Sequence, residues 1–122
     1  MRRSRGALSC SPCHIVMREL TPSECKAHIE NSVQKPLLLD VREPWEYRIA
    51  ALEGSTLIPM RDIPAASESL DPEQEIVVIC HHGIRSRHVA RYLESRGFSR
   101  VINLRGGVDA WARELDTSLS TY

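Results

Sequence analysis

The sequence predicts an α/β fold: an open, mostly parallel sheet of about five strands with helices on both faces. Two observations lead to this prediction. Short apolar runs alternate along the chain with segments of helical periodicity, which is typical of parallel sheets built from strand–helix–strand units. The runs at 37–41 and 76–79 are continuously apolar apart from Asp40, as expected of strands that are covered on both faces.

The first predicted helix begins at Thr21, which can cap it. Pro22 suits the first helical position, and Glu24 completes a capping box. One face carries a residue of apolar character at every fourth position, namely Cys25, Ile29 and Val33. The pair Lys35-Pro36 is expected to end this helix.

The middle of the chain predicts three strands with short connections. The strands are expected at 37–41, 55–59 and 76–79, with a turn into a short helix at 43–47 and a further turn at 71–73. In an open parallel sheet, ligands bind beyond the carboxyl ends of the strands. Asp40, Arg42 and Cys80 lie at two such ends, which makes them candidate functional residues.

The last third predicts two longer helices and a fourth strand. A helix at 86–96 has Gly97 as its C-terminal cap, and one of its faces carries Val89, Tyr92, Leu93 and Arg96. A strand follows at 101–104. Gly106-Gly107 then turns into a last helix, with one face formed by Val108, Trp111, Ala112 and Leu115.

Length and composition indicate a single globular domain. The 122 residues are 42% hydrophobic and 26% charged, with 16 basic and 16 acidic side chains. Balanced charge gives no reason to expect nucleic acid or a membrane surface as partner, and no apolar run approaches a membrane span. We expect a loosely ordered basic extension at 1–16, a domain at 17–116 and a polar, fraying tail at 117–122.

The four cysteines do not form a disulfide framework, because alternating strands and helices supply a core instead. The basic start lacks the apolar region of a signal peptide, so a reduced, cytoplasmic setting is expected. Residues 10–14 read CSPCH, which matches the c-type haem pattern and a redox C-x-x-C. A chance match is the favoured interpretation of this motif, a sulfur-accepting dithiol is less favoured, and haem attachment is least favoured. No cofactor is therefore expected.

Cys80 is the most informative residue of the chain. It ends an apolar strand and opens a loop that leads directly into a helix, where unpaired amides and the helix dipole stabilise anions such as a thiolate. Gly83 permits a tight loop, and Arg85 can offer a planar fork to an anionic ligand. His81 and His82 are adjacent in the sequence, and adjacent residues rarely bind the same ion, so no metal site is predicted.

Four segments together resemble the motifs of rhodanese-like domains. They are LDVREPWEY at 39–47, the glycine-containing stretch at 53–59, CHHGIRS at 80–86 and LRGGVDAW at 104–111. The resemblance covers roughly residues 17–116 in the order and spacing of that family. The loop at 80–86 is similar to the active-site loop of small bacterial rhodaneses.

The resemblance implies a sulfurtransferase that works through a persulfide on Cys80. Sulfur would come from thiosulfate or a persulfide and pass to cyanide, a thiol or a protein thiol. The donor would be bound by the rest of the loop, chiefly through its amides: His81, His82, Gly83, Ile84, Arg85 and Ser86. Asp40 and Arg42 would brace that loop from a neighbouring strand.

Two alternatives remain beside this reading. A rhodanese-like module could carry sulfur or bind a partner protein without turnover. A phosphatase or arsenate reductase is less favoured, because the arginine of a C-x5-R loop would fall at Ser86, whereas Arg85 comes one residue earlier. One departure is Ala51, which stands where many relatives carry a histidine.

Overall fold

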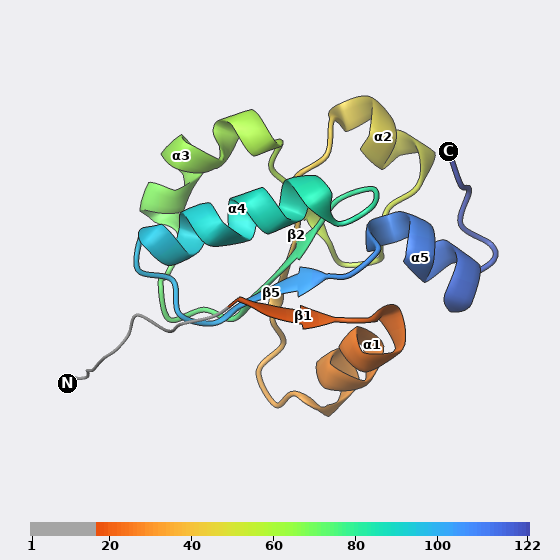
Figure 1. The fold of residues 1–122 in the computed structure, drawn as a ribbon, viewed down its shortest axis with the longest axis horizontal. Helices are drawn as coiled ribbons and strands as arrows, with labels where there is room; N and C mark the ends of the chain where they lie inside the picture. The colour runs from red at the N-terminus through yellow and green to blue at the C-terminus, as the bar shows by residue number, and fades with distance from the viewer. Residues whose placement is uncertain (1–16) are drawn as a thin grey trace.

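The computed structural model describes residues 17–122 as a five-stranded parallel sheet with helices around it (Figure 1). The strand order is β1-β5-β4-β2-β3, and every neighbouring pair is parallel. The strands are β1 Arg18–Leu20, β2 Leu37–Asp40, β3 Thr56–Leu57, β4 Ile76–Ile79 and β5 Val101–Leu104. The predicted fold class is therefore confirmed.

Helices cover both faces of this sheet. They are α1 Pro22–Asn31, α2 Pro44–Ile49, α3 Ile63–Ala66, α4 Ile84–Ser95 and α5 Gly107–Glu114, with short 3₁₀ turns at Met60–Asp62 and Ser67–Ser69. Helices α3 and α4 pack on one face, and α1 and α5 pack on the other. Alternate residues of β4 enter the two cores, Ile76 and Val78 facing α4 while Val77 and Ile79 face α1 and α5.

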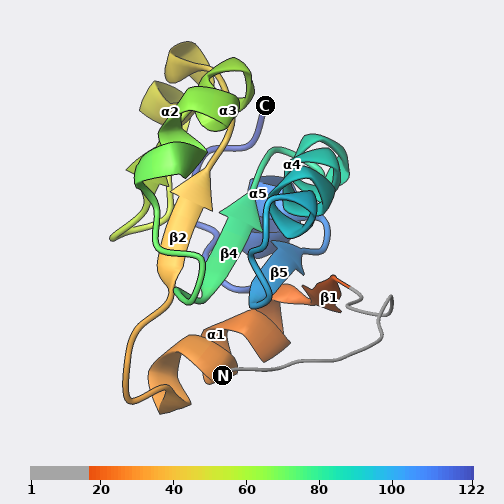
Figure 2. The ribbon, with the colours of Figure 1, turned by 90° about the vertical axis from the view of Figure 1, so that its left-hand side faces the viewer.

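Strand β4 is the centre of the sheet and positions the candidate site. All four of its residues are buried, and it pairs with β2 on one side and β5 on the other. The register sets Asp40 opposite Ile79, so Asp40 and Cys80 emerge at the same edge of the sheet. Figure 2 shows the arrowheads of β2 and β4 pointing toward that edge, where α2 lies.

The first helix forms as its sequence predicts, but it is shorter. Thr21 accepts from the Glu24 amide at 3.2 Å, and the Glu24 carboxylate accepts from the Thr21 amide at 2.9 Å. The helix ends at Asn31, before the pair Lys35-Pro36. Val33 lies beyond that end and is fully exposed, so the expected third apolar position of the face is wrong.

Two further differences concern an element at each end of the sequence. Strand β1 at Arg18–Leu20 was not predicted, because three mixed residues at a sheet edge carry no periodic signal. The tail, which the sequence predicts to fray, ends in Tyr122, whose ring and hydroxyl contact site residues. Among residues 17–122, no helix is both long and apolar enough to span a membrane.

Candidate active site around Cys80

The Cys80 thiol lies at the carboxyl end of β4, in a tight loop that leads into α4. The residue is 1% exposed, and the Gly83 amide donates to its Sγ atom at 3.0 Å. Gly83 has φ +97°, and a Cβ there would approach the Gly106 amide nitrogen to 3.1 Å. The loop therefore needs glycine at this position both for its backbone conformation and for its close approach to Gly106.

The start of α4 presents further amides beside the sulfur. The helix begins at Ile84, two residues earlier than its sequence predicts, and its first-turn amides have no acceptor inside the helix. The first helical bond runs from the Arg87 amide to the Gly83 carbonyl at 3.3 Å. The amides of Ile84, Arg85 and Ser86 therefore lack acceptors within the helix, as do the amides of helix starts that bind anions.

Helix α5 holds the other side of the loop. The Val108 amide donates to the Cys80 carbonyl at 2.8 Å, and the Asp109 amide donates to the His81 carbonyl at 3.0 Å. A Cβ on Gly107, whose φ is +62°, would overlap both of these carbonyl oxygens. The two glycines of the LRGG segment thus seat the Cys80 loop, which gives that segment a physical role.

Glu46 is a site residue that the sequence analysis missed. Its carboxylate accepts two parallel hydrogen bonds from the Arg85 guanidinium, at 2.7 and 2.8 Å, and the residue is only 4% exposed. These bonds lower the pKa of Glu46 to about 2 and raise that of Arg85. The signal was available, because Glu46 belongs to the segment LDVREPWEY that carried the resemblance.

Asp40 and Arg42 form a fully buried ion pair, with Arg42 Nη2 2.7 Å from Asp40 Oδ2. The same Nη2 atom donates to the Ala50 carbonyl at 2.6 Å, and Nη1 lies 3.4 Å from the Glu46 carbonyl. The hydrogen bonds of this pair to other side chains and carbonyls are thus with α2, its end and Tyr122, and none of them is with the Cys80 loop. Support reaches the loop through Glu46, which holds Arg85.

Ser86 faces the sheet. It is fully buried, and its hydroxyl donates to Asn103 Oδ1 on β5. Asn103 in turn donates to the Gly83 carbonyl at 3.2 Å and to Glu19 at 2.8 Å. The Ser86 side chain thus anchors the loop to β5. Asn103 was missed because a single polar residue inside an apolar strand shows no partner in sequence.

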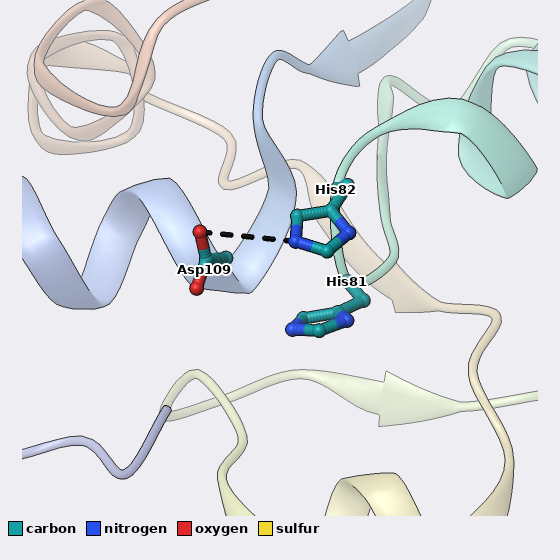
Figure 3. A group of neighbouring side chains, drawn as sticks. All are labelled: His81, His82 and Asp109. Atoms are coloured by element: carbon teal, nitrogen blue, oxygen red, sulfur yellow. Dashed lines mark ion pairs between the residues drawn. The ribbon is translucent and has the colours of Figure 1, made fainter. Parts of the chain in front are cut away.

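The two loop histidines lie beside Asp109 (Figure 3). His82 Nε2 is 3.8 Å from Asp109 Oδ2, and one ligand atom from each of the three residues lies within 4.8 Å of the others. The His81 and His82 ring centroids are 3.9 Å apart, and the ring planes are tilted by 32° to each other.

His81 is the more enclosed of the two rings. Tyr122 stacks on it, with ring centroids 3.9 Å apart and planes within 7°. Burial, followed by the neighbouring His82, lowers the pKa of His81. Its Nε2 atom is buried and has no hydrogen-bond partner among residues 17–122. The His81 ring is thus held chiefly by stacking.

Comparisons with known proteins agree with this architecture. A chloroplast Rhodanese-like/PpiC domain-containing protein of Arabidopsis thaliana is 42% identical over 89 residues, or 70% of this chain, which spans 30% of that protein. The putative sulfurtransferase YtwF of Bacillus subtilis is 37% identical over 98 residues, covering 80% of this chain and 93% of YtwF.

Solved structures show the same fold. The crystal structure of a rhodanese-like domain protein from Staphylococcus aureus superposes with a TM-score of 0.73 at 30% identity, covering 87% of this chain and 99% of that one. The Rhodanese-like domain family matches residues 21–114, which contain the Cys80 loop and both of the glycines that seat it. The chain therefore belongs to the rhodanese-like domain family.

Proposed function

We propose that this protein is a sulfurtransferase that carries sulfane sulfur as a persulfide on Cys80. The observation that carries the proposal is the Gly83 amide, which donates to Cys80 Sγ at 3.0 Å at the start of α4. A donor to the sulfur stabilises its anionic, nucleophilic form. The names of relatives such as YtwF support sulfur transfer in general.

In the first half-reaction, the Cys80 thiolate attacks the sulfane sulfur of thiosulfate. A sulfur–sulfur bond forms at Sγ, the bond between the two thiosulfate sulfurs breaks, and its electron pair leaves with sulfite. In the second half-reaction, cyanide or a thiolate attacks the outer sulfur, and the Cys80 thiolate is released. Both steps move negative charge close to the first-turn amides of α4, which bind it without reorganisation.

Arg85 is proposed to bind the oxygens of the anionic donor. Glu46 takes one N–H from each of its terminal nitrogens, so the Nε–H and one further N–H on each nitrogen remain for a ligand. The bidentate pair fixes the plane of the guanidinium, which is one-third exposed. Glu46 therefore serves as a positioning residue, and it also offsets part of the cationic charge.

The test is intact mass spectrometry after treatment with thiosulfate, followed by peptide mapping. The expected result is one added sulfur atom on Cys80, which a reducing thiol removes. Turnover with thiosulfate and cyanide then distinguishes an enzyme from a module that only carries sulfur. Sulfur found on Cys25 in place of Cys80 would overturn the proposed mechanism.

The acceptor and setting follow from the same chemistry. Cyanide, small thiols and protein thiols can all attack a persulfide, so we propose a thiol or protein thiol as the cellular acceptor. Among residues 17–122, both cysteines are free thiols, which supports a reducing, cytoplasmic setting.

A further inference from the structure

The segment after α5 turns back across the molecule toward the candidate site. The Leu119 amide donates to the Asp116 carbonyl at 3.1 Å, and Leu119 packs against the core beneath α1 and α5. From that turn, the dark-blue segment in Figure 1 returns to lie beside α2. We call residues 116–122 the strap.

Tyr122 attaches the strap to the candidate site. Its hydroxyl accepts from Arg42 Nη1 at 2.7 Å and donates to Glu46 Oε2 at 3.1 Å. Its ring stacks on His81 and meets the Trp45 ring edge-on, with centroids 5.9 Å apart. One side chain thus touches the Cys80 loop, the buried brace and the carboxylate that holds Arg85.

The hydroxyl contacts are specific. A phenol has one proton to donate and lone pairs to accept with, and both functions are used on charged partners. Hydrogen bonds to charged groups are about twice as strong as neutral ones. Without the hydroxyl, Arg42 Nη1 keeps only the 3.4 Å contact with the Glu46 carbonyl among residues 17–122.

Access to the sulfur is the consequence. Cys80 is 1% exposed, so a bulky donor or acceptor reaches Sγ only when a neighbouring group moves. β4 pairs with a strand on each side, and the Cys80 loop is hydrogen-bonded to α5. The strap is held near the site by Tyr122, whereas Ser120 and Thr121 beside it are exposed. The strap is therefore the part of the surroundings that can separate without breaking the sheet.

We propose that Tyr122 is a gate on Cys80 that sets the size of the reagents which reach the thiol. With Tyr122 docked on His81 and Glu46, small reagents enter; with Tyr122 released, a bulky thiol can approach. The gate itself does not depend on the proposed function. Only its extension from reagents in general to sulfur acceptors rests on that function. It predicts that small acceptors are used with the strap docked, and protein thiols with the strap released.

The test measures the alkylation rate of Cys80 by peptide mapping, which separates it from Cys25. Iodoacetamide is the small reagent, and a maleimide on a polyethylene glycol chain is the bulky one. In Tyr122→Ala, we expect the bulky-to-small rate ratio to rise by about ten- to a hundredfold, as lost bonds to charged groups predict. Tyr122→Phe keeps the stacking and should give a smaller rise.

The matched control is Thr121→Ala, on an exposed neighbouring residue, which should leave the ratio unchanged. An unchanged ratio in Tyr122→Ala would overturn the gate, and so would equal acceleration of both reagents, which indicates general loosening. Alkylation needs no sulfur transfer. If the wild type accepts no sulfur while the ratio still rises, the proposed function fails and the gate stands.

Discussion

Cys25 and Cys80 are buried to the same degree, at 1% exposure each, and both are free thiols. Both contribute to an apolar core, but the polar groups around their sulfurs differ. Cys25 lies within α1 against an apolar core, and burial raises its pKa to about 11. Cys80 follows β4, where the Gly83 amide donates to its sulfur. Burial alone therefore does not decide whether a thiol is reactive; the backbone groups that face it do.

The difference arises from where each cysteine lies in its element. The Cys25 amide is already bonded to the Thr21 carbonyl at 2.8 Å, so the backbone around it is satisfied by its own helix. Cys80 lies between a strand end and a helix start, where amides have no internal acceptor. Substitutions around the two sulfurs test whether this contrast is the source of the chemistry.

The largest expected effect comes from exchanging each sulfur for oxygen. Cys80→Ser should lower sulfurtransferase turnover by roughly a thousandfold or more, because the nucleophile is lost. Cys25→Ser should keep most of the turnover, because that thiol faces a core. Steady-state assays with thiosulfate and cyanide measure both. Substantial turnover in Cys80→Ser, with both variants folded by circular dichroism, would end the distinction.

The second-largest effect is expected from Gly107→Ala, which disturbs the packing of the Cys80 loop against α5. In Gly107→Ala, the new Cβ would overlap the carbonyl oxygens of Cys80 and His81, so we expect several kcal/mol of destabilisation and at least about a hundredfold loss of turnover. Gly54→Ala is the matched control: φ is +83° there, and nothing lies within 4 Å of the added atom. It should cost only about 1 kcal/mol. Urea unfolding and turnover measure the pair, and equal effects would contradict the role of Gly107.

Substitutions of Arg85 should affect the two half-reactions to different extents. Arg85→Ala should reduce kcat/KM for thiosulfate by about ten- to a hundredfold, through the loss of charge-assisted hydrogen bonds. Arg85→Lys should recover only part of this loss. Transfer from a preformed persulfide to cyanide should suffer less, since the donor has already left.

Arg87 supplies the matched control for that measurement. It lies two residues further along α4, is exposed, and pairs with Glu19 at 3.1 Å. Arg87→Ala should leave both half-reactions nearly unchanged. Equal losses in both half-reactions of Arg85→Ala would show that Arg85 supports the loop or the sulfur and does not bind the donor.

A smaller effect is expected from acid, which should weaken the contribution of the Glu46–Arg85 pair to folding stability. The hydrogen bonds from Arg85 lower the pKa of Glu46 from 4.5 to about 2, so the folded state favours the carboxylate. That stability is present above about pH 4.5 and is lost as pH falls toward 2. Because Arg85 is 34% exposed, screening reduces the contribution to on the order of 1–2 kcal/mol.

Glu46→Gln removes the titrating group and measures this contribution. The stability difference between wild type and Glu46→Gln should shrink between pH 4.5 and pH 2, as followed by urea unfolding. A difference that stays constant over this range would show that Glu46 does not gain its charge-dependent stability from Arg85.

The smallest effect is expected from the other pair of thiols. Cys10 and Cys13 lie outside the described residues and outside the family match at 21–114. A chain that starts at Met17 should keep its thermal midpoint and its turnover. A large loss of turnover would instead indicate that Cys10 and Cys13 relay sulfur to or from Cys80.

The sequence was most informative where the chemistry is local. The capping box at Thr21 and the strand at 76–79 follow from neighbouring residues, and both are confirmed. The Cys80 loop was also placed at a strand end facing a helix start, because its glycine and its flanking segments lie within a few residues.

Contacts between residues that are far apart along the chain could not be predicted in this way. Glu46 is 39 residues from Arg85, and Tyr122 is 76 residues from Glu46, so no periodicity connects them. The link from Asp40 and Arg42 to the Cys80 loop through Glu46 and Arg85 likewise joins residues that no local pattern connects. Only the sheet order decides which loops meet at its carboxyl edge.

That strand order has a consequence for synthesis. β1 pairs with β5, so the first strand of the sheet waits for the last one to leave the ribosome. Until then one edge of β4 is unpaired, and the Cys80 and His81 carbonyls lack the α5 amides that later hold them. A nascent chain thus exposes Cys80 in an unformed loop, and the contacts that shape this loop can form only after nearly the whole domain has emerged.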